Sequence, residues 1–539
     1  MPRFYYLPAE IQNMILGFTS TSPSVASYAA VNKHWQSFFE AKTFKSLILH
    51  QDDINEFSRI VKGYRRNYIK HLWLRVSLPE YPTALFKVEE DPKVLWEADC
   101  AFTESVHNLW GVLSKWDAPR HERYGLTFEL SVHSPSDWAT YINDDDSTKM
   151  DVDLYKQYLA TGSTESYKNS EDVHSAYETL GDTLSSIGIP TPIQHAYWHA
   201  TTHSLLGWKP LSFAFEKASY DDDSGYFSED TATPVGEDTT APISEDTAIP
   251  ISKEESANYH NTEQQLPAVP VITKMLIRRQ QFRCIAPEVL GTMTETLPNI
   301  QEISIERWRC QEAIDEKDWC RSAHFTFGMG LPPSLKTLSL YGEISEIFHT
   351  WTSKDVKALS LAKSLRQYTK HLESLSVSHL IDAKEFLRPF WSAKSDTESL
   401  PKWEHLKTLS LTSEILNTDS EKEINKLLCA AARAARKMPN LQLLELWNGK
   451  DGQAGVFRYQ VINSNGEIKW RGTGANYLDA QVLQEWRQTS ILHGQRDLRE
   501  STSKLRPEEI SHTGAVLRHL QSRERVLHPV SGYRASCEL

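Results

Sequence analysis

The stretch LPPSLKTLSL, residues 331–340, places apolar side chains at Leu335, Leu338 and Leu340, and the same spacing occurs four more times in the second half of the chain. The other copies are LPNIQEISI (297–305), KHLESLSV (370–377), WEHLKTLSL (403–411) and MPNLQLLEL (438–446). The first apolar residue of each triplet follows that of the previous copy by 34 to 37 residues. A fixed period of this length is typical of a chain built from repeated structural units.

Each unit is predicted to pair one strand with one helix. Alternating apolar side chains at the end of each triplet favour a strand with one face in a core. The stretches between triplets have helical spacing, most clearly 420–438, which begins at Ser420 and is rich in Ala and Leu. Repeated strand–helix units indicate a leucine-rich solenoid with an unusually long period. Several unrelated strands in an α/β domain remain the alternative interpretation.

The first half of the chain carries the same signal less regularly. Triplets begin at Phe44 and at Ile69, and GLTFELSV (125–132) alternates apolar and polar residues. The predicted array therefore begins near residue 44. Near the other end, 456–472 reads as a β-hairpin that turns at Ser464, Asn465 and Gly466 and caps the array.

An acidic insert separates the two halves. Residues 219–268 contain 12 Asp or Glu and one basic residue, a net charge of −11, and three copies of an eight-residue unit begin at 228, 236 and 244. Its apolar content is too low to offset the entropy of ordering, so a disordered linker is predicted. Within it, DSGYFS (223–228) matches a phosphodegron pattern, which makes Ser224 and Ser228 candidate phosphorylation sites. A chance match in an acidic stretch is the simpler interpretation.

Bulk composition and motifs exclude several functional classes. No run of 18 apolar residues and no signal-peptide pattern occur, and without the insert the chain carries a charge near −2, too little basic surface for nucleic acid. Six scattered cysteines without C-x-x-C pairs indicate buried or incidental thiols, no metal site and a reducing compartment, cytoplasmic or nuclear. Since no nucleotide-binding, zinc-protease or nucleophile-elbow motif is found, we expect neither a cofactor nor catalysis.

The opening stretch LPAEIQNMIL (7–16) predicts a short amphipathic helix. Pro8 suits the first turn, and an apolar stripe follows at i, i+3, i+4 and i+7, formed by Ile11, Met14, Ile15 and Phe18. A helix of this length needs tertiary contacts to persist. A second helical stretch, 24–41, repeats the spacing, yet two or three short helices cannot enclose every apolar residue. An exposed face that favours binding is therefore predicted.

These residues resemble the F-box motif. The resemblance rests on a Leu-Pro start, an amphipathic first helix, and a Val and Trp about two dozen residues later, and it covers about 40 of 539 residues. Asn32 stands where the family often has Cys. The resemblance implies a three-helix module that binds a Skp-family adaptor through Leu7, Pro8, Ile11, Ile15, Val31 and Trp35. An ordinary helical cap for the array, with Trp35 as its core anchor, is the alternative.

What the resemblance implies for the whole chain is the substrate-recognition subunit of an SCF-type cullin-RING ubiquitin ligase, a non-catalytic receptor with an unidentified protein target. An F-box scaffold with no ubiquitylation role is the alternative function. We expect an α/β fold: an F-box (1–42), a first leucine-rich-repeat-like section (43–218), the acidic linker (219–268), a second such section (269–450), and a C-terminal hairpin and helical cap (451–539).

Overall fold

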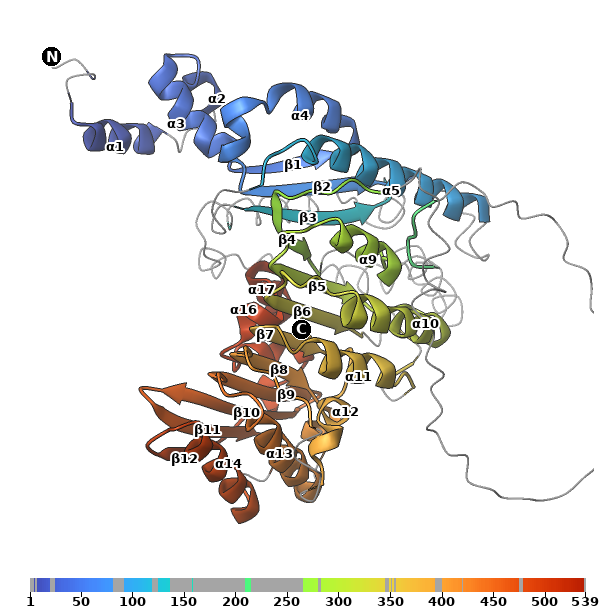
Figure 1. The fold of residues 1–539 in the computed structure, drawn as a ribbon, viewed down its shortest axis with the longest axis vertical. Coiled ribbons are helices and arrows are strands. Elements are labelled where there is room, and N and C mark those ends of the chain that lie inside the picture. Colours follow the sequence, from blue (N-terminus) through green and yellow to red (C-terminus); the bar gives the residue numbers. More distant parts are fainter. Residues whose placement is uncertain are drawn as a thin grey trace, which may run out of the picture.

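The computed structural model describes most of the chain outside the central insert (Figure 1). The described residues are 4, 7–19, 25–80, 92–118, 125–135, 158, 209–214, 265–279, 283–344, 349, 351–352, 355–392, 400–418, 420–474 and 478–537. They form a mixed α/β protein with one large sheet, which confirms the predicted α/β class. The acidic repeats, with Ser224 and Ser228, lie outside the described residues.

Twelve strands form a single sheet in which the spatial order is the sequence order. Strands β1 to β9 are parallel, β10 is antiparallel to both of its neighbours, and β12 is parallel to β11. The strands are β1 (Ser46–His50), β2 (His71–Ser77), β3 (Leu126–His133), β4 (Ile272–Ile277), β5 (Glu302–Trp308), β6 (Thr337–Glu343), β7 (Ser374–Ser378), β8 (Thr408–Thr412), β9 (Leu443–Lys450), β10 (Gln453–Ile462), β11 (Asn465–Gly472) and β12 (Leu498–Lys504).

The apolar triplets lie where the sequence predicts strands. Leu338 of β6 pairs with Ile303 of β5 and with Leu375 of β7, so equivalent triplet positions form continuous rows across the sheet. The same core cluster contains Leu335, which is buried just before β6. These five strand predictions are confirmed, as are the strands predicted in the first half. The strands on either side of the insert also join directly, since β3 pairs with β4.

Helices cover one face of the sheet (Figure 1). They connect successive parallel strands, as crossover connections require. The larger helices of this layer are α4 (Ile54–Ile60), α5 (Pro92–Leu113), α9 (Pro287–Glu295), α10 (Ala313–His324), α11 (Leu359–Tyr368), α13 (Glu421–Ala435) and α14 (Ala480–Leu492), with the short α12 (Ala383–Phe386) between α11 and α13. The predicted helix at 420–438 is confirmed as α13. The Ala and Leu side chains on its inner face are buried against the strands.

The C-terminal segment, which we define as residues 505–537, crosses the opposite face of the sheet. Its helices are α15 (Thr513–Leu517), α16 (Arg523–Val526) and α17 (Pro529–Cys537). Figure 1 shows α16 and α17 beside β5 to β8, on the side away from α9 to α11. Because strand side chains alternate between the two faces, the residues between the triplet leucines point toward this segment. The sheet is therefore the middle layer of three.

Two local predictions need correction. The hairpin of β10 and β11 forms, but its two-residue turn is Asn463 and Ser464, both with positive φ (49° and 65°), so Asn465 and Gly466 already belong to β11. Turns of this type match the twist of the flanking strands. The second helical stretch is broken into α2 (Val25–Tyr28) and α3 (Lys33–Thr43), because Asn32 caps α3 with hydrogen bonds to the amides of His34 and Trp35.

None of the helices in the described part of the chain has the length and apolar character needed to span a membrane.

Candidate protein-interaction surfaces

The first helix, α1 (Ala9–Thr19), buries only one side chain. Pro8 lies just before it and accepts the first helical hydrogen bond from the Gln12 amide (3.0 Å). Leu16 is fully buried. The side chain of Gln12 also donates to the Leu7 carbonyl (2.8 Å). Leu7 and Pro8 are thus fixed to the start of the helix, Leu7 half-buried and Pro8 exposed.

The apolar stripe of α1 faces solvent. Phe18 is 77% exposed and Met14 is 57% exposed, with Ile11 and Ile15 also classed as exposed. Four large apolar side chains on one side of an 11-residue helix form a contiguous patch, not a scattering of single residues. We define the docking stripe as these four residues: Ile11, Met14, Ile15 and Phe18.

Trp35 of α3 packs against α2 and against Phe4, which precedes α1. Its ring lies 5.7 Å from that of Phe4, 6.2 Å from that of Tyr28 and 5.8 Å from that of Phe39, measured between centroids. Phe39 is fully buried, whereas Val31, just before the α3 cap, is 57% exposed. Of the six residues predicted to contact an adaptor, the structure therefore places Pro8, Ile11, Ile15 and Val31 on the surface, Leu7 at its edge, and Trp35 mainly in the packing between helices.

A polar brace connects α3 to the sheet. The nearly buried Glu40 carboxylate accepts hydrogen bonds from Arg65 Nη2 (2.6 Å), Arg65 Nε (3.2 Å) and the Tyr64 hydroxyl (3.0 Å), both in the 3-10 helix η3 (Gly63–Tyr68). The hydrogen bonds from Arg65 hold the pKa of Glu40 below its usual value. Because η3 leads directly into β2, the N-terminal helices have a defined orientation relative to the sheet.

On the face opposite the helices, three strands carry buried carboxylates: Glu129, Glu306 and Glu445 are each at most 1% exposed. Glu129 of β3 accepts hydrogen bonds from His71 Nε2 (2.9 Å) and Arg278 Nε (2.6 Å). Buried carboxylates are costly unless they are hydrogen-bonded or paired. The partners of the other two lie largely in the C-terminal segment.

Glu445 and Glu306 hold the C-terminal segment by its backbone. Glu445 of β9 accepts hydrogen bonds from the amides of Gln521 (3.0 Å) and Ser522 (2.8 Å) and pairs with Arg458 Nε (2.6 Å). Glu306 of β5 accepts from the amide of Arg279 (2.9 Å) and from that of His528. Burial raises the pKa of Glu306 to about 7, against the opposing effect of these hydrogen bonds and of the Arg278 charge.

Apolar contacts complete this attachment. Tyr341 and Trp447, which point away from the helix layer, form a second core with Val516, Leu517 and Leu527 of the C-terminal segment, and all five are at most 3% exposed. Small hydroxyl residues of the strands lie between these apolar side chains and face the C-terminal segment. One of them, Ser339, donates a hydrogen bond from Oγ to the carbonyl of Arg525 (2.7 Å). The polar face from β6 to β10 is therefore covered by the chain itself.

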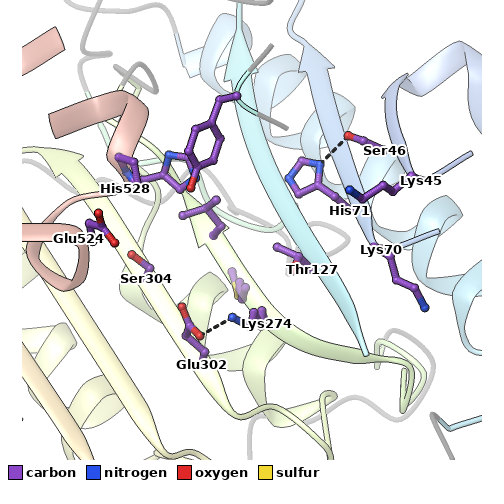
Figure 2. A pocket seen from close by; sticks show the side chains of 14 residues that line it. Lys45, Ser46, Lys70, His71, Thr127, Lys274, Glu302, Ser304, Glu524 and His528 are labelled. Atoms are coloured by element: carbon purple, nitrogen blue, oxygen red, sulfur yellow. Dashed lines mark hydrogen bonds and ion pairs between the residues drawn. The ribbon is translucent and has the colours of Figure 1, made fainter. Parts of the chain in front are cut away.

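A pocket of about 410 Å³ lies at the edge of this cover, between strands β1 to β5 and the C-terminal segment (Figure 2). Its wall takes residues from the amino ends of β1 to β5 and from the C-terminal segment, including Glu524 and His528. Lys274 pairs with Glu302 (2.7 Å), and Ser46 contacts His71 Nδ1 (3.2 Å). Lys45 and Ser46 follow α3 almost directly. The pocket thus borders β1, the strand that follows α3 in the chain.

In the part of the chain that the structure describes, no group of three or more His, Cys, Asp or Glu could hold a metal ion. Sequence reasoning missed Glu306 and Glu445, whose alternating position resembles that of a solvent-facing strand residue. It also missed the contact between Cys284 and Cys310, for which the sequence offers no signal. The burial and the contacts of these four residues are seen only in the folded structure.

Residues 330–528 match a family described as "Family of unknown function (DUF6546)". The match begins just before β6 and ends at His528, so it includes the strands covered by the C-terminal segment and most of that segment. No curated protein matches the chain significantly.

Proposed function

We propose that this protein is the substrate-recognition subunit of an SCF-type cullin-RING ubiquitin ligase, in which the N-terminal helices form an F-box that binds a Skp-family adaptor. The observation that carries the proposal is the docking stripe on α1, whose four large apolar side chains face solvent while Leu16 packs inward. Apolar burial contributes about 25 cal/mol per Å², so covering this stripe with a partner would be strongly favourable.

The rest of the chain fits a receptor of fixed geometry. We interpret the strand–helix units, interrupted by the acidic insert, as an irregular leucine-rich-repeat-like solenoid that presents a target. The brace from Glu40 to Arg65 supports this role, because a receptor must hold its target at a defined distance from the ligase machinery. Catalysis would then be by proximity, without side-chain chemistry from this chain.

The pocket beside α3 is the best candidate contact for a target. The C-terminal segment fills the polar face from β6 to β10, whereas the pocket stays open at the amino ends of β1 to β5. Its wall carries lysines, hydroxyl groups and two glutamates, one of them paired with Lys274, and such a wall suits polar side chains. The position next to the N-terminal helices would bring a bound target close to the adaptor.

The test is co-purification of the full-length protein with a co-expressed Skp-family adaptor. We expect Leu7→Ala combined with Pro8→Ala to abolish adaptor recovery, and Met14→Ala combined with Phe18→Ala to reduce it at least about tenfold, since each lost apolar contact costs about 1–2 kcal/mol. Far-UV circular dichroism and thermal unfolding should match the wild type.

Ile491→Ala combined with Leu492→Ala is the matched control, because this pair on α14 is similarly exposed (72% and 67%) at the other end of the sheet. The control should recover the adaptor fully. Wild-type recovery by the Leu7 and Pro8 variant would overturn the proposed function.

A further inference from the structure

Two buried thiols meet beneath the carboxyl end of β5. Cys284 and Cys310 are 26 residues apart, yet their sulfur atoms lie 3.7 Å from each other. Cys284 precedes α9, and Cys310 follows β5. Each residue keeps about 5% of its surface exposed, so a peroxide molecule can reach the sulfur atoms only through a fluctuation of the surrounding structure.

A fixed guanidinium contacts both sulfur atoms. Arg307 Nη2 donates to Cys284 Sγ (3.2 Å) and to Cys310 Sγ (3.4 Å). The same guanidinium makes two hydrogen bonds to the Glu316 carboxylate (2.9 and 2.8 Å) and lies 3.7 Å from the centre of the Trp319 ring. Glu316 in turn accepts the Cys310 amide (2.8 Å). Arg307 of β5 is therefore held in position by Glu316 and Trp319 of α10.

These contacts give the two thiols different acidities. Burial by itself would raise the pKa of Cys284, but the hydrogen bond with Cys310 and the Arg307 charge outweigh it and lower that pKa. The hydrogen bond with Cys284, together with burial, raises the pKa of Cys310 well above its ordinary value. A lower pKa at Cys284 than at Cys310 is the ordering that a nucleophilic thiol and its resolving partner require.

We propose that Cys284 and Cys310 form a redox-active dithiol that a peroxide oxidises to a disulfide. The Cys284 thiolate attacks one peroxide oxygen, breaks the O–O bond and becomes a sulfenic acid, while hydroxide leaves. Cys310 then attacks the sulfenic sulfur, the S–S bond forms, and the hydroxyl takes the Cys310 proton and leaves as water, while the hydroxide of the first step remains. In sum, the thiolate, the thiol and one hydrogen peroxide give one disulfide, one water and one hydroxide.

The chain provides internal reference thiols. Burial raises the pKa of Cys429 to about 11, and burial with the nearby Glu316 charge raises the pKa of Cys320 to about 12. Cys320 is equally buried and touches the same Glu316 carboxylate (3.5 Å), but Arg307 makes no hydrogen bond to it among the described contacts. Oxidation selective for Cys284 over Cys320 and Cys429 would therefore report the Arg307 contact, not burial or proximity to Glu316.

The experiment exposes the reduced full-length protein to hydrogen peroxide at pH 7, blocks the remaining thiols by alkylation and maps the cysteine peptides by mass spectrometry. We expect a Cys284–Cys310 cross-linked peptide that dithiothreitol reverses, formed at least about tenfold faster than any oxidation of Cys429. In Cys310→Ser, a dimedone-reactive sulfenic acid should accumulate at Cys284.

Arg307→Met tests the source of the reactivity. We expect the pH midpoint for alkylation of Cys284 to rise and the peroxide rate to fall at least about tenfold at pH 7. If Arg307→Met does not fold, the proposal is tested by Cys310→Ser alone, in which a sulfenic acid should accumulate at Cys284. Oxidation of Cys320 or Cys429 as fast as that of Cys284, or a cross-link that forms only after denaturation, would overturn the proposal.

Discussion

At the scale of single residues, the largest departures from ordinary chemistry lie where the C-terminal segment meets the sheet. Glu306 is fully buried and accepts two backbone amides, one from Arg279 and one from His528. The charge of Arg278 lies close enough to oppose the effect of burial on the pKa of Glu306. An ionised carboxylate here is costly, so the folded protein keeps Glu306 mainly protonated up to about pH 7.

We therefore predict that Glu306 makes the protein less stable as the pH rises. Its pKa is raised from 4.5 to about 7 on folding, so the folded state binds the extra proton between these values. The stability that it contributes is fully present below pH 4.5 and is lost as the pH rises through 7, by up to about 3 kcal/mol. The measurement is the free energy of unfolding by urea at pH 5, 6, 7 and 8 for the wild type and Glu306→Gln.

The difference between the two proteins isolates this group, because His379 and His528 titrate in both. Burial lowers the pKa of each histidine, to about 4 and about 3, so both make stability rise with pH below about 6.5. We expect Glu306→Gln to gain stability relative to wild type as the pH rises from 5 to 8. A constant difference across that range would contradict the raised pKa.

At the scale of secondary-structure elements, the brace between α3 and η3 decides whether the N-terminal helices move with the sheet. We predict that Arg65→Met loosens α3, because it leaves the Glu40 carboxylate, 8% exposed, with fewer donors. The cost is roughly 1 kcal/mol, since Arg65 itself is 29% exposed. Hydrogen exchange of amides 33–43 should accelerate about fivefold, while exchange in β5 and β6 stays unchanged.

Arg59→Met serves as the matched control, because Arg59 forms an exposed pair with Glu56 (2.9 Å) that is expected to contribute little. Exchange across α3 should be the same as in wild type. Equal acceleration in both variants would mean that the brace does not fix α3.

The elements also show which predictions a sequence can support. The triplet leucines face the helix layer, so their spacing predicted the five strands β5 to β9, whereas β4, which has no such triplet, was not predicted. In α1, by contrast, the stripe from Ile11 to Phe18 faces outward and Leu16 is the buried residue, a choice that tertiary contacts make. From the sequence, Asn32 looks like an ordinary polar surface residue. Its role as the cap of α3 follows only from the two hydrogen bonds that its side chain accepts.

At the scale of the whole molecule, the second core is the feature that periodicity could not predict. Ser339 and Glu445 alternate with leucines as solvent-facing strand residues do, and only the return of the chain from beyond β12 buries them. Such a contact joins residues nearly 190 positions apart, as for Ser339 and Arg525. The C-terminal segment is consequently a third layer of the protein, and among the described residues a pocket remains over the amino ends of β1 to β5.

We predict that this third layer unfolds together with the sheet. Leu527→Ala should destabilise the protein by about 2–4 kcal/mol, as much as Leu409→Ala in the helix-side core, because both side chains are at most 1% exposed. Urea unfolding followed by tryptophan fluorescence measures the free energy, and limited proteolysis reports on the junction near 505. Ile491→Ala, an exposed site, should stay within about 0.5 kcal/mol of wild type. If the C-terminal segment could instead detach while the sheet stays folded, Leu527→Ala would permit cleavage near 505 with little change in the main unfolding transition.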